Sequence, residues 1–246
     1  MTIAIIGGTG LTALDRLQIT HCQSLNTPYG VPSADLVWGM LDGQQLVFLA
    51  RHGNPHRIPP HKINYRANIW ALHQVGVKAI IAVAAVGGIS PAMVPAAIAI
   101  PDQIIDYSYD REHTFFADDL EHVTHIDFSY PYDAGLRQRI LAAARSIDMK
   151  ILETGCYGCT QGPRLETAAE IRRMAQDGCD LVGMTGMPEA ALARELALPY
   201  ANISVVANWG AGLDSGEITM AEIEANLSIG MQRAIELLAA TIRLSA

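Results

Sequence analysis

The sequence predicts a single α/β domain that spans residues 1–246, with a central, mixed and largely parallel sheet flanked by helices. Short apolar runs rich in β-branched residues alternate with amphipathic stretches along the chain. The apolar runs are continuous and do not alternate with polar residues, which is typical of strands covered on both faces. The sequence has no repeat, low-complexity tract or linker. One layered α/β arrangement around a buried sheet accounts for these features most simply.

Six apolar runs are expected to form strands, and five amphipathic runs are expected to form helices. The strands are expected at residues 3–6, 46–50, 79–86, 104–107, 181–183 and 200–207. The helices are expected near residues 65–74, 134–146, 166–176, 189–196 and 221–244. Thr167-x-x-Glu170 and Thr219-x-x-Glu222 have the spacing of capping boxes at two helix starts. Pro188 stands where a first-turn proline would.

The composition and the charge restrict the class of partner. Hydrophobic residues make up 50% of the 246 residues and charged residues 17%, which excludes disorder as the main state. The net charge of −8 argues against nucleic acid or an anionic membrane as the main partner. Any phosphate on a ligand must therefore be held by a local site.

The beginning of the chain has the pattern of a strand and not of a signal peptide. Residues 1–6 carry no basic segment and no small-residue cleavage site, and they run directly into Gly7 and Gly8. No apolar stretch reaches the ~18 residues of a membrane span. We therefore expect no membrane association and a cytoplasmic location.

The cysteine spacing raises the question of a metal or redox site. The chain has Cys22, Cys156, Cys159 and Cys179, and the second and third have the spacing of a redox pair or of half a zinc site. A structural zinc site needs a second pair of ligands, and only Cys179 follows nearby. We therefore favour thiols with a structural role.

Two segments, residues 51–61 and 110–133, are too long and too polar for simple connections. Structured loops of this length are usually functional. The second one carries His113, His122 and His125. These histidines could suggest zinc, but we favour a wall of a pocket shared between subunits, and we expect no metal.

Three short segments place anion-binding groups at the ends of predicted strands or beside a helix start. Thr9 follows the first strand in a glycine turn, Arg51 and His52 follow the second, and Thr185 stands near Pro188. Backbone N–H groups at a turn, a guanidinium fork and a hydroxyl at a helix N-terminus all favour anions. Since ligands of α/β sheets bind at the carboxyl ends of strands, these groups could converge on one tetrahedral anion.

Two further segments place a hydrogen-bonding side chain beside apolar residues. Glu166 lies in the segment 161–167, and Asn208 lies in the segment 205–209. This combination is what a pocket for a heterocycle requires.

In this order along the chain, the segments resemble the trimeric purine nucleoside phosphorylase superfamily, and in particular its methylthioadenosine and methylthioinosine phosphorylase branch. The resemblance runs from about residue 3 to about residue 240. Its segments are Ile6-Gly7-Gly8-Thr9-Gly10, Ala50-Arg51-His52-Gly53, Asn64-Tyr65-Arg66-Ala67-Asn68-Ile69-Trp70-Ala71-Leu72, Gln161-Gly162-Pro163-Arg164, and Met184-Thr185 followed by Pro188-Glu189. The combination is highly specific, although no single segment is.

The resemblance implies a role for each candidate site residue. Phosphate would be bound by Thr9, Arg51, His52 and Thr185 and by the backbone around Ala84 and Ala85. The nucleoside would contact Leu165, Glu166, Met184, Asn208, Trp209, Gly210, Met220 and Ile223, and His125 of a neighbouring subunit would close the pocket. The family usually has a hydroxyl at the position of Ala84, so one phosphate contact is backbone-only or missing. The resemblance also implies a homotrimer with no metal or organic cofactor, in which inorganic phosphate is a cosubstrate.

The pair Asn208 and Glu166 favours a 6-oxopurine base. Methylthioadenosine phosphorylases resemble one another in carrying Asp at the position of Asn208 and again at that of Gly210, whereas superfamily members that act on inosine and guanosine pair Asn with Glu. The Asn amide can donate to O6, and an ionised Glu can accept from N1–H. A 6-aminopurine reverses this pattern at both edges, which leaves buried partners mismatched at roughly 1–3 kcal/mol each.

The 5′ end of the ribose gives a further indication. Met220 and Ile223 fall where the superfamily contacts the 5′ substituent, and an apolar lining suits a methylthio group, although both could equally be helix core. Inosine-cleaving relatives have a His near residue 222, where this chain has Glu222, which we expect to cap the helix. We therefore expect phosphorolysis of 5′-methylthioinosine to hypoxanthine and 5-methylthioribose 1-phosphate, with Asn208 stabilising the departing base in an oxocarbenium-like transition state.

Alternatives remain open at this point. Within the same class they are a general inosine/guanosine phosphorylase and a methylthioadenosine phosphorylase. A dinucleotide-dependent oxidoreductase would use the glycine turn after Ile6, but it would need an acid near residues 27–31, and that segment has none. A non-catalytic nucleoside-binding module would differ from the enzymes in showing no phosphate-dependent turnover.

Overall fold

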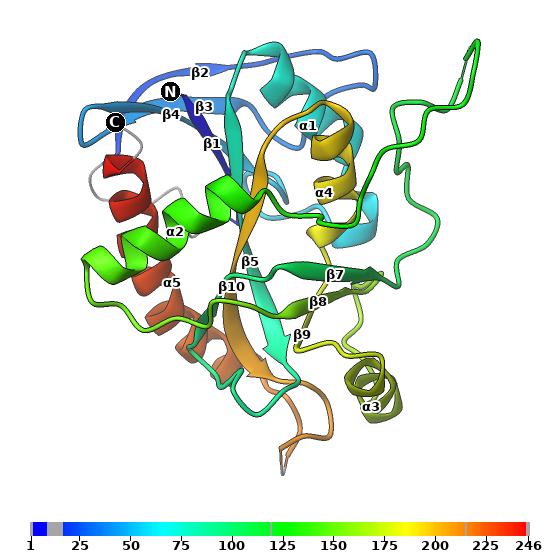
Figure 1. Ribbon diagram of the computed structural model, residues 1–246, viewed down its shortest axis with the longest axis vertical. Coiled ribbons are helices and arrows are strands. Elements are labelled where there is room, and N and C mark those ends of the chain that lie inside the picture. Colours follow the sequence, from blue (N-terminus) through cyan, green and yellow to red (C-terminus); the bar gives the residue numbers. More distant parts are fainter. Residues whose placement is uncertain (1, 9–16, 119, 215, 245–246) are drawn as a thin grey trace.

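The computed structural model describes residues 2–8, 17–118, 120–214 and 216–244 (Figure 1). Within these residues the chain forms an α/β fold with one mixed sheet of ten strands, as the sequence predicts. Thr9, one of the predicted phosphate ligands, lies outside the described residues, and Gly8 is the last described residue of the glycine turn.

The strands of the sheet follow one path, with a branch at β5. Its strands are β1 (Ile3–Gly7), β2 (Gln18–Gln23), β3 (Leu36–Leu41), β4 (Gln44–Ala50), β5 (Ala79–Gly88), β6 (Ile98–Ala99), β7 (Gln103–Asp106), β8 (Cys156–Cys159), β9 (Leu181–Gly183) and β10 (Tyr200–Trp209). The order is β2-β3-β4-β1-β5-β9-β8-β7, and β10 pairs with β5 and with β6. The pairs β1–β4, β1–β5, β5–β10, β7–β8 and β8–β9 are parallel, and the others are antiparallel.

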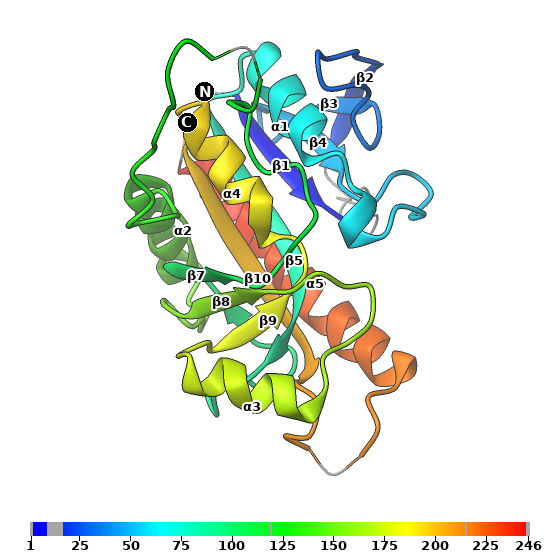
Figure 2. The ribbon, with the colours of Figure 1, turned by 90° about the vertical axis from the view of Figure 1, so that its right-hand side faces the viewer.

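The two long strands β5 and β10 join the two halves of the sheet. The first half of β5 pairs with β1, whereas its last residues, Gly87 and Gly88, pair with β9. β10 follows β5 along most of its length. Figures 1 and 2 show β7, β8 and β9 running across the lower part of these two strands. The strand ends of both halves therefore meet along β5.

Five helices cover the sheet in the described residues. They are α1 (Tyr65–Gln74), α2 (Ala134–Ser146), α3 (Ala168–Gln176), α4 (Gly186–Glu195) and α5 (Met220–Arg243), with a short 3-10 helix, η2, at Pro60–Lys62. α1 and α2 have the predicted bounds. Thr167 and Thr219 form the predicted capping boxes of α3 and α5. Met187 is not helical, so regular α4 begins at Pro188, close to the predicted start.

The core has a layer on each face of the sheet because its strands are apolar on both faces. Along β1, Ala4 and Ile6 join one buried cluster together with side chains of α1 and α4, whereas Ile3 and Ile5 join a second one with α2 and α5. Figure 2 shows α4 on one face of β5 and β10 and α5 on the other. This two-sided burial explains why the apolar runs in the sequence are continuous.

Four strands escape prediction for local reasons. β2 is exposed along most of its length and has a polar sequence, so it lacks an apolar run. β3 is interrupted by Gly39, β6 has only two residues, and β8 contains Gly158. These strands form because neighbouring strands offer backbone partners and not because of their own composition.

α5 extends beyond the core. Its fully buried residues begin at Gly230, so the first ten residues of the helix lie outside the buried core. A Cβ at Gly230 would come within 2.3 Å of Val205 Cγ1, so glycine permits the close approach of α5 to β10. None of the described helices combines the length and hydropathy that crossing a membrane requires.

Candidate functional site

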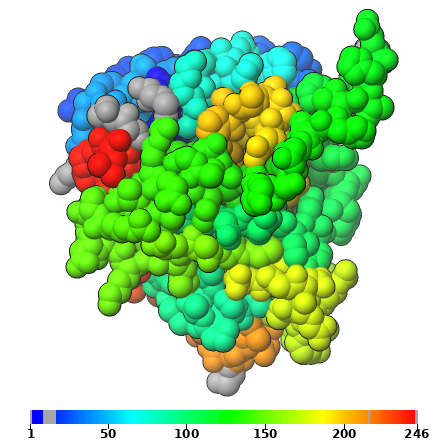
Figure 3. Space-filling view, in the orientation of Figure 1, coloured from blue at the N-terminus to red at the C-terminus, as the bar shows by residue number. Residues whose placement is uncertain are grey.

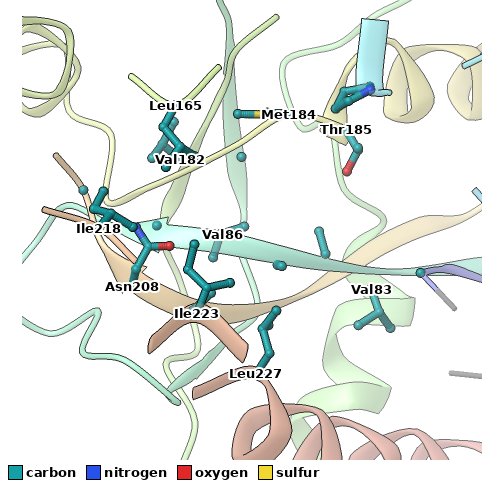
Figure 4. Close-up of a pocket in the computed structure, with 18 of the residues that line it drawn as sticks. Val83, Val86, Leu165, Val182, Met184, Thr185, Asn208, Ile218, Ile223 and Leu227 are labelled. Carbon is teal, nitrogen blue, oxygen red and sulfur yellow. The ribbon is translucent and has the colours of Figure 1, made fainter. Parts of the chain in front are cut away.

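A cavity of about 570 Å³ opens where the ends of β1, β4, β5, β9 and β10 meet the first half of α5. Figure 4 shows Leu165, Val182, Met184 and Thr185 on one side of β5, and Ile223 and Leu227 of α5 on the other. The carboxyl ends of strands are the usual place for ligands in α/β sheets. The segments predicted to bind an anion therefore converge, as far as the structure describes them.

The predicted phosphate ligands within the described residues all line this cavity. Arg51, His52, Ala84, Ala85 and Thr185 belong to its wall. Within β5 every residue is buried except Ala85, so this part of the strand faces open space. Thr185 is the N-cap of α4, and its side chain makes no capping hydrogen bond. Gly8, the last described residue before Thr9, stands on the same wall.

Arg51 is held in a buried ion pair with Glu189. The two side chains are 2% and 1% exposed, and Nε of Arg51 lies 2.8 Å from Oε2 of Glu189. Nη2 donates to Oε1 at 2.9 Å, and Nη1 donates to the carbonyl of Val83 at 3.0 Å. A guanidinium has five N–H groups, so this arrangement orients Arg51 and leaves two N–H groups for a ligand.

The charge state of Arg51 is fixed by its partner. Burial alone would lower the pKa of Arg51, but the Glu189 carboxylate raises it above its ordinary value. A cation is therefore present at the cavity wall at every physiological pH. Sequence reasoning missed Glu189 as the partner, although a buried arginine requires a carboxylate, and the segment Thr185–Glu189 offers one.

His52 is held as a neutral ring. Nδ1 lies 2.8 Å from the carbonyl oxygen of Ile58, which can only accept a hydrogen bond. Nδ1 therefore carries the hydrogen of the neutral ring, and Nε2 carries a lone pair. The ring stacks on His56 with centroids 4.3 Å apart. Burial, together with the nearby Arg51 charge, lowers the pKa of His52 to about 4.

Arg111 fixes the strand ends at the other side of the cavity. Its Nη1 donates to the carbonyls of Met184 and Met187, and its Nη2 donates to those of Thr160 and Gln161 at 3.0 and 2.8 Å. The side chain is 8% exposed. Because it ties the end of β8 to the turn before α4, it positions Met184 and Thr185. The sequence analysis predicts a functional role for the segment 110–133, which contains Arg111, but it does not single out Arg111 itself.

The two predicted base-binding side chains share the cavity. Asn208 follows an irregularity in the β5–β10 register between Val206 and Asn208, and its Nδ2 donates to its neighbour's carbonyl at 2.7 Å. A bulge of this kind redirects the side chains that follow it. Glu166 accepts a hydrogen bond of 2.6 Å from the Thr160 hydroxyl. Leu165 and Gly210 line the cavity beside them.

The predicted ribose and 5′ residues divide into two groups. Met184 and Ile223 line the cavity, together with Leu227 and Met231 of α5. Met220, Trp209 and His125 do not belong to its described lining. Met220 is 65% exposed at the start of α5. Glu222 accepts from the backbone N–H of Thr219, so it is the predicted cap residue.

The cysteines and histidines form no metal cluster in the described part of the chain. Cys156 and Cys159, which share the spacing of a metal half-site, stand on β8 as free thiols, and Cys22 and Cys179 are free as well.

Comparison with known proteins identifies relatives along the whole chain. The model of the phosphorylase superfamily matches residues 2–243. A probable S-methyl-5′-thioinosine phosphorylase of Pseudomonas syringae pv. tomato is 59% identical over 232 residues, which cover 94% of each chain. The 6-oxopurine nucleoside phosphorylase of Pyrococcus furiosus is 42% identical and covers 98% of this chain and 92% of its own. The structure of methylthioadenosine phosphorylase from Schistosoma mansoni with adenine matches with a TM-score of 0.93 at 30% identity, over 99% of this chain and 91% of that chain.

Replacing Glu189 with Ala is expected to lower the free energy of unfolding by about 3–5 kcal/mol, because the Arg51 charge then stays buried without a partner. Urea denaturation measures the change. Glu153→Ala is the matched control, since Glu153 pairs at 2.9 Å with Arg145 on the surface, and removing such a pair costs about 1 kcal/mol or less. Equal losses in the two variants would contradict a structural role for the buried pair.

The stability of the protein is expected to fall between about pH 6.5 and about pH 4 in part because of His52. The pKa of His52 is lowered from 6.5 to about 4 in the folded chain, so in this window the unfolded chain binds more protons, and acid favours unfolding. His52→Gln should lose less unfolding free energy than the wild type between pH 7 and pH 4.5, as measured by urea denaturation at about these two values. His122→Gln, at an exposed position, should behave as the wild type does; an unchanged pH dependence in His52→Gln would show that this ring is not buried as a neutral group.

Proposed function

Since the chain belongs to the phosphorylase superfamily, we propose that it transfers the pentosyl group of 5′-methylthioinosine from hypoxanthine to inorganic phosphate. It is a pentosyltransferase of the purine nucleoside phosphorylase type. The products are hypoxanthine and 5-methylthioribose 1-phosphate. The observation that carries this proposal is the meeting of Asn208 and Glu166 with Arg51 and Thr185 on one cavity whose remaining wall is largely apolar, with His52, His56 and Ser228 as its other polar side chains.

The reaction exchanges one bond at the anomeric carbon for another. The bond from C1′ to N9 of the base breaks, and its electron pair leaves with the base. A phosphate oxygen forms the new bond to C1′ from the opposite face. The proposed catalytic residue is Asn208, because stabilising the charge that develops on the departing base lowers the barrier. No organic cofactor or metal is required for this exchange, and phosphate is consumed as a cosubstrate.

The polar groups at one end of the cavity suit a phosphate dianion. Two N–H groups of Arg51 remain available, and the Thr185 hydroxyl, which makes no capping hydrogen bond, stands just before the regular part of α4. The backbone at Ala84 and Ala85 lies along the same wall. We propose that these groups, with His52 and Thr9, hold the phosphate, and that Ala84 contributes no side-chain contact.

The groups at the other end suit a 6-oxopurine. One N–H of Asn208 is used by the carbonyl of Trp209, which leaves the second to donate to O6, while the amide oxygen accepts from a protonated N7. We propose that Glu166 accepts from N1–H, and that Leu165, Trp209 and Gly210 form the surroundings of the base. The names of the relatives include both methylthioinosine and 6-oxopurine nucleoside phosphorylases, in line with this choice.

The wall formed by α5 favours a 5′-methylthio group. Ile223, Leu227 and Met231 of α5 present apolar side chains to the cavity, together with Ile218 just before the helix, whereas Ser228 adds one hydroxyl. Figure 4 shows Ile223 and Leu227 facing β5. An unpaired hydroxyl against such a wall is unfavourable. A general inosine or guanosine phosphorylase is therefore the second candidate. A methylthioadenosine phosphorylase is the third, because it would need a different base-binding pair.

We also propose that the enzyme is a homotrimer with shared active sites. Part of the green segment between β7 and α2 stands out from the body in Figures 1 and 3, and Tyr109, Val123 and Tyr130 on this segment are 69%, 71% and 73% exposed. His125 lies on this segment and is proposed to reach the cavity of a neighbouring subunit, near Met184 and Met220. Sedimentation of a dilute, fully active monomer would contradict this assembly. A cytoplasmic location stays a prediction of the sequence.

A panel of four nucleosides tests the proposed reaction. Methylthioinosine, methylthioadenosine, inosine and adenosine are each incubated with and without phosphate, and release of the base is measured. We expect the highest kcat/KM for methylthioinosine and no turnover without phosphate. A higher kcat/KM for methylthioadenosine would overturn the choice of base, and a higher one for inosine would overturn the choice of 5′ group.

Replacing Asn208 with Asp should shift the preference from methylthioinosine toward methylthioadenosine. An ionised Asp repels O6 but accepts from an exocyclic amine, so the ratio of the two kcat/KM values should change by at least about tenfold if ~1.4 kcal/mol is redistributed. The shift stays incomplete, because Glu166 still requires N1–H. Asn26→Asp, at an exposed position away from the cavity, controls for the added charge. An unchanged ratio in Asn208→Asp would mean that this residue does not read the base.

A further inference from the structure

Asn226 of α5 contacts the backbone directly before the proposed catalytic residue. Its Nδ2 donates to the carbonyl oxygen of Ala207 at 2.8 Å, and the residue is partly buried. A carbonyl oxygen can only accept a hydrogen bond, so the amide must turn its N–H group toward β10. The contact therefore joins the helix that forms the apolar wall of the cavity to the strand that carries Asn208.

The helix presents Asn226 to β10 because of its spacing from two neighbours. Residues three and four positions apart share a face of a helix, so Asn226 lies on the face of Ile223 and Gly230. Ile223 lines the cavity, and Gly230 is where α5 approaches Val205 of β10. Asparagine is a poor residue for a helix interior, since its side chain competes for backbone groups. Its place in α5 is therefore explained by the contact with Ala207 and not by helix formation.

Ala207 is the residue at which the register between β10 and β5 shifts. Val206 and Asn208 pair with consecutive residues of β5, so Ala207 between them has no register partner there. Val206 is also held by the segment before β6, because its N–H donates to the carbonyl of Ala97 at 2.9 Å and its carbonyl accepts from the N–H of Ala96 at 2.8 Å. The amide from α5 thus supports the backbone at the point where regular pairing is interrupted.

The supported carbonyl belongs to the same peptide group as the N–H of Asn208. A peptide group is planar, so a hydrogen bond to the carbonyl of Ala207 also restrains the N–H and the Cα of Asn208. The direction in which the Asn208 side chain leaves the backbone depends on this plane. The side chain is held a second time by the hydrogen bond from its Nδ2 to the carbonyl of Trp209 at 2.7 Å. The backbone and the amide of Asn208 are therefore each held by one contact.

We propose that Asn226 is a positioning residue, which holds the peptide before Asn208 so that the Asn208 amide meets the departing base. This inference rests on the proposed function, in which Asn208 stabilises the charge that develops on the base. Such stabilisation requires groups that are fixed in advance, and a displacement of about 1 Å can cost about a hundredfold in rate. Asn226 is not part of the described cavity lining, so it acts on turnover through Asn208.

The test uses two variants of Asn226 and a matched control on the same helix. Asn226→Asp keeps the shape of the side chain but at about pH 7.5 replaces the N–H donor by an ionised oxygen, and Asn226→Ala removes the group. If the aspartate variant does not fold, Asn226→Leu keeps the size without a charge. The control is Arg233→Ala, because Arg233 also ties α5 to a backbone carbonyl, that of Ala96 at 3.0 Å, outside the described cavity lining.

For each protein, kcat and KM are measured for methylthioinosine and inosine at saturating phosphate, and Tm is measured by thermal unfolding. We expect both Asn226 variants to lower kcat about ten- to a hundredfold for both nucleosides, with smaller changes in KM. Arg233→Ala should keep the kcat of the wild type even where it lowers Tm. A wild-type kcat in either Asn226 variant, or an equal loss in Arg233→Ala, overturns the proposal. So does an effect confined to the KM of methylthioinosine, since Asn226 would then support only the apolar wall.

A double-mutant cycle separates positioning of Asn208 from a general loosening of the site. Asn226→Ala is combined with Asn208→Ala, and single-turnover rates with methylthioinosine are measured for both single variants and the double variant. If Asn226 acts through Asn208, its replacement should change the rate of Asn208→Ala by less than about twofold, because the group that it positions is already gone. Losses that multiply in the double variant contradict this role.

The proposed function and the role of Asn226 fail separately. A wild type that does not cleave methylthioinosine with phosphate, or an unchanged kcat in Asn208→Ala, overturns the proposed function or the catalytic role of Asn208, and the inference with it. A large loss in Asn208→Ala, combined with a wild-type kcat in the Asn226 variants or with multiplying losses in the cycle, overturns only the role of Asn226.

Discussion

The ion pair between Arg51 and Glu189 is the interaction on which the cavity depends. A buried charge without its partner is strongly destabilising, so the end of β4 and the start of α4 must come together wherever the chain folds. The pair lies against β5, since Arg51 also donates to the carbonyl of Val83. Three walls of the cavity are thereby fixed relative to one another, and a cation with free N–H groups is left at the surface of the cavity. Stability and the proposed binding of phosphate therefore depend on one contact.

Arg111 has the corresponding role at the other end, but it uses carbonyl oxygens and the side chain of Gln161. It belongs to the long segment that also carries His125, the residue proposed to enter a neighbouring subunit. The segment is thus fixed at its base by the strand ends and projects at its tip (Figure 1). Formation of the site and the proposed assembly consequently depend on the same stretch of chain, since displacing Arg111 would release both Met184 and Thr160.

The polar and apolar parts of the cavity come from different elements. Strand ends and the loops after them supply the hydrogen-bonding groups, because backbone ladders hold them firmly, and the bulge in β10 turns Asn208 to its place. α5 supplies the apolar wall with a part of the helix that lies beyond the core. Its capping box uses Glu222, so this side chain serves the helix itself. The proposed contacts to the base and to the 5′ group therefore come from separate elements.

The sequence by itself determined the α/β class, the bounds of α1 and α2, both capping boxes and the segments that line the cavity. Apolar periodicity and capping spacing are local properties, and motifs at strand ends converge in any such sheet. The tertiary structure alone decided the partners. Glu189 stands 138 positions from Arg51, and Thr160 reaches Glu166 only because β8 ends beside β9. Strands β2 and β8 were likewise missed, since their pairing depends on neighbouring backbones. Local spacing cannot encode a contact that chain topology creates, so the segments that line the cavity were predictable and the interactions that orient their side chains were not.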